Sequence, residues 1–244
     1  MSRRAGTTDR RPRSESERPM FGQARVEFKD LCLDVNDLVA AAEFWAPVLG
    51  LTAELRDQVA LLTDGVANHT TWLNLVPERH SVKNRVHLDV HTSSIESLVQ
   101  RGAGVIMKHE HWTVMADVEG GEFCAFVREP SALPRYRLYE LMVDAADPKR
   151  IAGWWADRFG TVAKTDEQHG FSWLEPVAGL PWDVIFDVVP EPKTVKNRVH
   201  WDVFGETEEL LGVGATLLRR RDGVIEWDIL ADPEGNEFCV FDRS

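Results

Sequence analysis

Two short phrases of the sequence place an imidazole two residues before a carboxylate. His87 and Asp89 form this pair in "VHLDV", and His200 and Asp202 form it in "VHWDV". Residues two apart on a strand share a face, so each pair points one way. Imidazole and carboxylate groups can hold a divalent ion or transfer protons. For either histidine, a hydrogen-bonded structural role is an equally good interpretation.

Both phrases belong to a repeat that runs through nearly the whole chain. "SVKNRVHLDV" begins at residue 81 and "TVKNRVHWDV" at residue 194, and "EGGEFCAF" returns near the end as "EGNEFCVF". Such self-similarity indicates two copies of one fold. We predict a disordered tail, a first domain, a linker and a second domain at residues 1–22, 23–131, 132–135 and 136–244.

Within each copy, the pattern predicts two successive strand-helix-strand-strand-strand units. Alternating runs such as "FKDLCLDV" and "YELMVDA" are typical of half-buried strands. The segments that follow them begin with acidic caps and end at Gly, as helices do. The chain therefore contains four such units, and its fold class is α+β.

Four such units, the helix ending "FWAPVLG", the turn "VKNRVHWDV" and the ending "DPEGNEFCVF" resemble the vicinal oxygen chelate superfamily, in particular its glyoxalase-like branch. That superfamily includes glyoxalase I, bleomycin-resistance proteins and extradiol dioxygenases. The resemblance spans about residues 24 to 244. It implies that paired units curve their mixed sheets into cups, two in all. A cup holds a small ligand and, in metal-dependent members, a divalent ion.

Alternation along the strands predicts which side chains line the cups. Leu31 and Leu33 alternate with polar residues and should pack under the helix, which leaves the polar side for the cup. On this basis the first copy would bind substrate through Asp30, Trp72, Asn74, His87 and Glu122.

The resemblance also implies where metal ligands would lie. The corresponding positions are Asp30, Asn74, His87 and Cys124 in the first copy and Glu140, Asp187, His200 and Cys239 in the second. In both copies a carboxylate, Glu122 or Glu237, stands two residues before the cysteine, on the same face but about 7 Å away along the strand. This departure argues against a conventional four-ligand site.

If one copy binds a metal, the second is the better candidate. Glu140, Asp187, His200 and Glu237 would supply one imidazole and three carboxylates, an oxygen-rich set that suits Mg, Mn or Fe. Glu237, when not bound to the metal, would serve as the catalytic base.

Composition limits the remaining possibilities. The 244 residues carry a net charge of −12, which argues against a nucleic-acid partner, and no apolar run is long enough to span a membrane. Three cysteines cannot all pair with one another, so we expect a cytoplasmic protein. We expect a monomer or a homodimer.

Two functions remain open from the sequence. The first is a metal-dependent lyase, isomerase or dioxygenase that acts on a small molecule with adjacent oxygens. The second is a metal-free protein that binds or sequesters a small molecule, as bleomycin-resistance proteins do. In either case, one copy could keep the site while the other serves as scaffold, and Asn74 in place of Asp187 makes the first copy the better scaffold.

Overall fold

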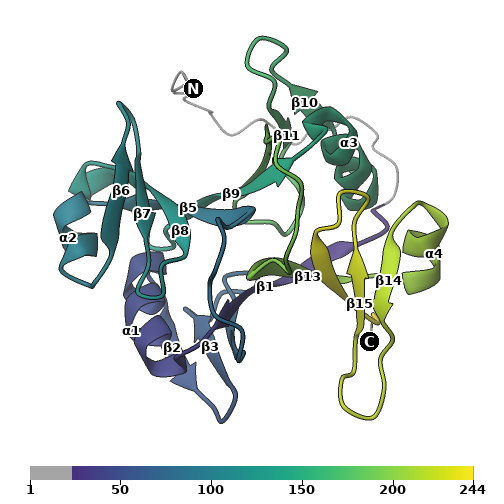
Figure 1. Ribbon diagram of the computed structural model, residues 1–244, viewed down its shortest axis with the longest axis horizontal. Coiled ribbons are helices and arrows are strands. Elements are labelled where there is room, and N and C mark those ends of the chain that lie inside the picture. The colour runs from purple at the N-terminus through teal and green to yellow at the C-terminus, as the bar shows by residue number, and fades with distance from the viewer. Residues whose placement is uncertain (1–23, 244) are drawn as a thin grey trace.

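The computed structural model describes residues 24–243, so the predicted tail, residues 1–22, lies outside the described part. Each of the four units contains a strand, a helix and three more strands, as predicted (Figure 1). Unit 1 comprises β1 (Glu27–Val35), α1 (Leu38–Leu49), β2 (Thr52–Leu55), β3 (Val59–Thr63) and β4 (Thr71–Leu75). Unit 2 comprises β5 (Val86–Thr92), α2 (Ile95–Val99), β6 (Gly104–Lys108), β7 (Thr113–Ala116) and β8 (Glu122–Val127).

The second half repeats this order after a short 3-10 turn, η2 (Pro130–Ala132). Unit 3 comprises β9 (Leu138–Ala145), α3 (Pro148–Phe159), β10 (Ala163–Thr165), β11 (Ser172–Leu174) and β12 (Asp183–Val188). Unit 4 comprises β13 (Val199–Phe204), α4 (Thr207–Gly212), β14 (Thr216–Arg219), β15 (Asp228–Ala231) and β16 (Glu237–Phe241). The α+β fold class is confirmed.

The units pair across the two halves of the chain. Sheet A has the order β14-β15-β16-β13-β1-β4-β3-β2 and joins unit 1 to unit 4. Sheet B has the order β10-β11-β12-β9-β5-β8-β7-β6 and joins unit 2 to unit 3. The central ladders, β1–β13 and β5–β9, are both antiparallel. Each sheet therefore takes half of its strands from each copy, and neither copy forms a sheet of its own.

The helices begin and end as the sequence predicts. The carboxylate of Asp37 accepts hydrogen bonds from the amides of Val39 and Ala40 at the start of α1, and Asp147 caps α3 in the same way. Both α1 and α3 end at a glycine in the left-handed conformation, with φ of 76° at Gly50 and 64° at Gly160. Such a φ favours glycine because a side chain there is strained.

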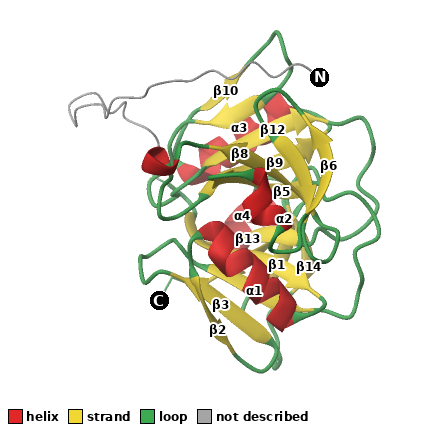
Figure 2. Ribbon diagram, turned by 90° about the vertical axis from the view of Figure 1, so that its left-hand side faces the viewer, coloured by secondary structure: helices red, strands yellow, loops and turns green. Residues whose placement is uncertain are grey.

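The apolar faces of both sheets belong to one shared core with α1 and α3. Trp45 on α1 packs edge-on against Phe123 on β8, with ring centroids 5.2 Å apart, and Trp155 on α3 packs against Trp201 on β13 at 4.9 Å. Each helix thus contacts both sheets, and Figures 1 and 2 show the two helices on different sides of the molecule. The polar faces of the sheets consequently point away from this core.

The repeated KNR turns, residues 83–85 and 196–198, join successive units within each half and contact the other half of the chain. In the first turn, the Nζ of Lys83 lies 2.5 Å from Oδ2 of Asp144, and Nη1 of Arg85 donates to the carbonyl of Glu191 at 2.6 Å. Lys196 makes the matching ion pair with Asp34. The turns therefore have a structural role at the joins between units.

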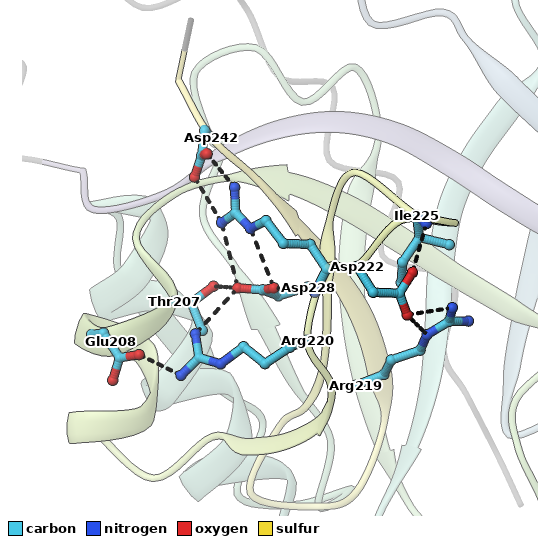
Figure 3. Close-up of polar contacts among 9 residues, drawn as sticks. Thr207, Glu208, Arg219, Arg220, Asp222, Ile225, Asp228 and Asp242 are labelled. Atoms are coloured by element: carbon cyan, nitrogen blue, oxygen red, sulfur yellow. Dashed lines mark hydrogen bonds and ion pairs between the residues drawn. The ribbon is translucent and has the colours of Figure 1, made fainter.

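The hairpin β14–β15 contains a network of arginines around a buried carboxylate (Figure 3). Asp228 accepts hydrogen bonds from the hydroxyl of Thr207 and from the amide of Arg221, both at 2.7 Å, and the guanidinium groups of Arg220 and Arg221 lie beside it. Burial alone would raise the pKa of Asp228, but these hydrogen bonds outweigh it and lower the pKa to about 2. The carboxylate is therefore held charged inside the fold.

No helix in the described range, residues 24–243, is long and apolar enough to cross a lipid bilayer.

Candidate functional site

The polar face of sheet A, which we call cup A, contains a cluster of thiol, imidazole and carboxylate groups. Ligand atoms of Cys32, His200 and Asp202 all lie within 4.8 Å of one another. The thiol of Cys32 donates to Oδ2 of Asp202 at 3.5 Å, and Sγ of Cys239 lies 3.8 Å from Nε2 of His200. Burial, followed by the charge of Asp202, raises the pKa of both thiols, so they stay protonated.

Cup A also contains its own cation. Lys29 occupies a bulge in β1, forms an ion pair with Asp30, and places its Nζ 4.2 Å from the ring centroid of Phe241. Thr70 donates a further hydrogen bond to Asp30. Asp30 lies opposite Asp202 in the β1–β13 ladder. Burial raises the pKa of Asp202, while the charges of His200 and Lys29 oppose the rise.

The matching polar face of sheet B, which we call cup B, brings together His87, Asp89 and Cys124, again with ligand atoms within 4.8 Å. Nε2 of His87 lies 3.2 Å from Oδ1 of Asp89 and 3.6 Å from Sγ of Cys124. Asp89 is 0% exposed, and within the described residues neither of its oxygens accepts a hydrogen bond. A buried carboxylate without hydrogen bonds is costly unless a cation or a proton satisfies it.

More carboxylates surround this cluster. Glu140 lies opposite Asp89 in the β5–β9 ladder, and Asp183 lies opposite Glu140 in the β9–β12 ladder. Tyr139 occupies the β9 bulge, the position that Lys29 has in cup A. Burial, followed by the charges of Glu140 and Asp183, raises the pKa of Tyr139 to about 12. Cup B is therefore acidic, with an aromatic residue where cup A has a lysine.

Aromatic side chains flank the acidic cluster of cup B. His91 stacks on Tyr139 with ring centroids 4.5 Å apart, and Phe126 packs edge-on against Tyr139 at 5.2 Å. Burial and the charge of Arg128 lower the pKa of His91 to about 4, so its imidazole is neutral near pH 7. Its Nδ1 is buried and has no hydrogen-bond partner among the described residues.

The predicted metal set does not lie in one cup. Glu140 and Asp187 belong to sheet B, whereas His200 and Glu237 belong to sheet A, on the other side of the shared core. The prediction grouped residues by copy, but the sheets pair units from different copies. This corrects the set that the sequence suggested.

The carboxylates Glu122 and Glu237 cap the KNR turns. Oε2 of Glu122 accepts from the amide of Asn84 at 2.9 Å, and Oε2 of Glu237 accepts from the amide of Asn197 at 3.1 Å. Oε1 of Glu237 also pairs with Nζ of Lys193 at 2.6 Å. Both oxygens of Glu237 are thus engaged, an arrangement that does not favour the catalytic role predicted for it.

The other predicted residues are divided between the cups as well. Asp30, Trp72 and Asn74 belong to sheet A, and His87 belongs to sheet B. The guanidinium of Arg56 lies 5.2 Å from the ring centroid of Trp72. Only His87 among the five predicted substrate-binding residues belongs to the cluster around Asp89.

The sequence placed Asp89 on one face with His87 and put Cys124 at a ligand position, although neither was among the residues predicted for the preferred substrate or metal site. Two further residues of the cups were missed. Lys29 and Tyr139 gave no such signal, because a bulge turns each of them onto the polar face.

The donor atoms of both cups fit a divalent metal. A thiol, an imidazole and a carboxylate within 4.8 Å form a set that suits zinc or Fe(II) better than Mg or Mn. Of the metals expected from the sequence, which were Mg, Mn and Fe, this donor set favours Fe. Cup B has the stronger need for a cation, since both oxygens of Asp89 lack hydrogen bonds within the described residues, whereas only Oδ1 of Asp202 lacks one.

Comparison with known proteins agrees with this architecture. The family model of the glyoxalase-like domain matches the sequence twice, at residues 30–126 and 140–241. Glyoxalase I from Zea mays has a similar structure, with a TM-score of 0.62 and 14% identity over 89% of this chain and 92% of that one. A putative dioxygenase from Bacillus subtilis has a TM-score of 0.57 and 11% identity, over 91% of this chain and 86% of that one. Among curated proteins there is no match. With both copies matched by the same domain model, the chain belongs to the glyoxalase-like domain family, as a tandem member of the vicinal oxygen chelate superfamily.

Proposed function

We propose that the protein is a divalent-metal-dependent lyase or isomerase of the glyoxalase type, with its active site in cup B. The observation that carries this proposal is Asp89, a fully buried carboxylate whose oxygens accept no hydrogen bond within the described residues. His87 lies 3.2 Å from it, and Cys124 lies 3.6 Å from His87. A bound cation would compensate the buried charge.

His87, Asp89 and Cys124 would hold the metal. When bound, a divalent ion supplies Lewis-acid stabilisation to two adjacent oxygens of a small substrate. Glu140, which faces Asp89 across the ladder, is the carboxylate that we assign to proton transfer at the carbon beside those oxygens. Tyr139 and His91 flank the same end of the cup and would pack against the substrate and limit the entry of water.

The neutral state of His91 suits this role. Burial and the charge of Arg128 lower the pKa of His91 to about 4, so its imidazole adds no positive charge to a site that must hold a cation. Its unpartnered Nδ1 can accept a hydrogen bond from a substrate hydroxyl.

The test compares matched substitutions in the two cups. Asp89→Asn and His87→Ala should abolish the retention of one metal per chain, because each removes a ligand from cup B. Asp202→Asn and His200→Ala remove the same groups from cup A and should leave that metal in place. The measurement is elemental analysis of protein purified without chelators or a metal-binding tag, followed by equilibrium dialysis against Zn²⁺, Fe²⁺ and Mn²⁺.

Two outcomes would overturn the proposal. Wild-type protein that binds none of the three ions above background would show that cup B holds no metal. Loss of the metal in Asp202→Asn but not in Asp89→Asn would place the site in cup A.

A further inference from the structure

A cavity outside both cups lies where the two ends of the described chain meet α3 and α4. Its volume is about 640 Å³, and it is lined by Ala24, Arg25, Asp157, Arg158, Glu206, Glu209 and Arg243. Pockets for small ligands have volumes of about 300–1,000 Å³. The size is therefore that of a binding site for a small molecule.

Arg158 is the unusual residue of this cavity. It is only 8% exposed, its Nε is buried without a hydrogen-bond partner, and among the described residues its guanidinium takes part in no ion pair. An arginine has five N–H donors in a rigid fork, so burial without an acceptor is costly. Burial lowers the pKa of Arg158, and the charge of Asp157 only partly opposes this.

The fold offsets part of this cost. Arg158 lies in the last turn of α3, where the helix dipole favours a cation by roughly 0.3–1 kcal/mol. Its guanidinium carbon also lies 4.9 Å from the ring centroid of Trp154. Neither contact supplies a hydrogen-bond acceptor to the guanidinium of Arg158, so its N–H groups remain available to a ligand.

The rest of the cavity wall is charged and adjustable. Arg25 pairs with Glu209 at 3.8 Å, and Arg243 pairs with Glu27 at 3.4 Å. All four of these side chains are at least 43% exposed. Exposed ion pairs of this kind contribute about 0–1 kcal/mol to stability. An incoming anion can therefore replace the carboxylate partner of either arginine at little cost.

From the cavity and the unpartnered Arg158, we propose that this is a second ligand site, which binds a small organic molecule through a carboxylate or phosphate group. The planar guanidinium of Arg158 can donate two parallel hydrogen bonds to the oxygens of either group. Arg25 and Arg243 stand at the rim and can contact the same anion. The acidic residues of the wall, Asp157, Glu206 and Glu209, would select ligands with a donor or a positive charge elsewhere in the molecule.

The experiment measures thermal unfolding of the full chain in phosphate, in propionate and in chloride at equal ionic strength. Wild-type protein should gain several degrees in Tm with a saturable dependence on phosphate or propionate, because a ligand that binds only the native state stabilises it. Arg158→Met should show no gain over chloride. In chloride alone, its Tm should equal or exceed that of wild type, because an uncompensated buried charge has been removed.

The control is Arg150→Met, which removes the same charge from the same helix at an exposed position paired with Glu234. It should keep the anion response of wild type. Arg158→Lys keeps the charge without the fork, should respond at least about tenfold more weakly, and replaces Arg158→Met if that variant does not fold.

The two anions distinguish the source of the ligand. A response to phosphate alone would indicate a phosphorylated ligand, and a response to propionate alone would indicate a carboxylate. No gain over chloride in wild type, or an equal gain in Arg158→Met, would overturn the proposal.

Discussion

Cup A and cup B occupy matching positions in the two sheets, and they differ in the residues that surround the shared histidine, aspartate and cysteine. Lys29, Thr70 and Cys32 of cup A correspond to Tyr139, Asp183 and Met142 of cup B. In cup A, Lys29 lies beside Asp30 and acts on Asp202, whereas in cup B the matching bulge residue beside Asp89, Glu140 and Asp183 is Tyr139. In cup A, Lys29 pairs with Asp30 and one oxygen of Asp202 accepts a hydrogen bond, while in cup B neither oxygen of the fully buried Asp89 accepts one from the described residues.

Exchanging the residues in the two bulges tests whether they determine the difference between the cups. Tyr139→Lys should weaken zinc binding by at least about 100-fold, because unit charges 4 Å apart interact by about 4 kcal/mol at an effective dielectric constant of 20. Lys29→Tyr should leave that affinity unchanged and add a weaker second zinc ion in cup A. Competition with a chromophoric chelator measures both constants. An unchanged affinity in Tyr139→Lys would show that the lysine does not distinguish the cups.

The outer hairpins of the two sheets differ as well, and the predicted effect there is on stability. Asp228→Asn in the β14–β15 hairpin should lower the free energy of unfolding by roughly 1–3 kcal/mol, since it leaves buried donors around a weakened acceptor. The matching β6–β7 hairpin has exposed apolar residues, among them Ile106 and Met107. Ile106→Thr should change stability by less than about 0.5 kcal/mol. Urea denaturation measures both, and equal losses would remove the contrast.

The same carboxylate predicts how stability depends on pH. The pKa of Asp228 is about 2 in the folded protein and about 3.9 in an unfolded chain. Its contribution is therefore fully present above about pH 4 and is lost as the pH falls toward 2. Asp228→Asn should flatten this part of the stability profile, measured by urea denaturation between pH 5 and 2. A profile as steep as that of wild type would assign the acid sensitivity to other groups.

The smallest predicted difference concerns the thiols of the two cups. Cys124→Ser should weaken zinc binding about tenfold, because a hydroxyl is a poorer zinc ligand than a thiolate. Cys239→Ser, the same change in cup A, should leave the zinc affinity unchanged. Isothermal titration with zinc compares the variants, and an equal loss in both would show that the cysteine in cup B is not a ligand.

Local sequence patterns predicted the elements well. The alternation of "VHLDV" placed His87 and Asp89 on one polar face, and the capping residues Asp37 and Gly50 marked the ends of α1. Each of these features depends on residues near one another in the chain. The repeat, found by comparing distant segments of the chain, predicted four units.

The local sequence does not determine which units pair with one another. His200 lies on a strand that could pair with β9 of its own copy or with β1 of the other, and its local sequence does not distinguish the two. The predicted metal set therefore joined Glu140 to His200, which belong to different sheets. Strict alternation would also place Lys29 on the apolar side with Leu31, and the bulge in β1 reverses this.

The crosswise pairing has a consequence for how the two cups can change. In a symmetric dimer of a single copy, every substitution would appear in both cups at once. Here the linker joins two copies into one chain, and residues 29 and 139 are separate positions. A lysine can oppose cation binding in one cup, while a tyrosine at the matching position of the other cup does not. Because the copies are joined in one chain, a substitution in one cup does not appear in the other. One protein can therefore combine a stable scaffold with a reactive centre.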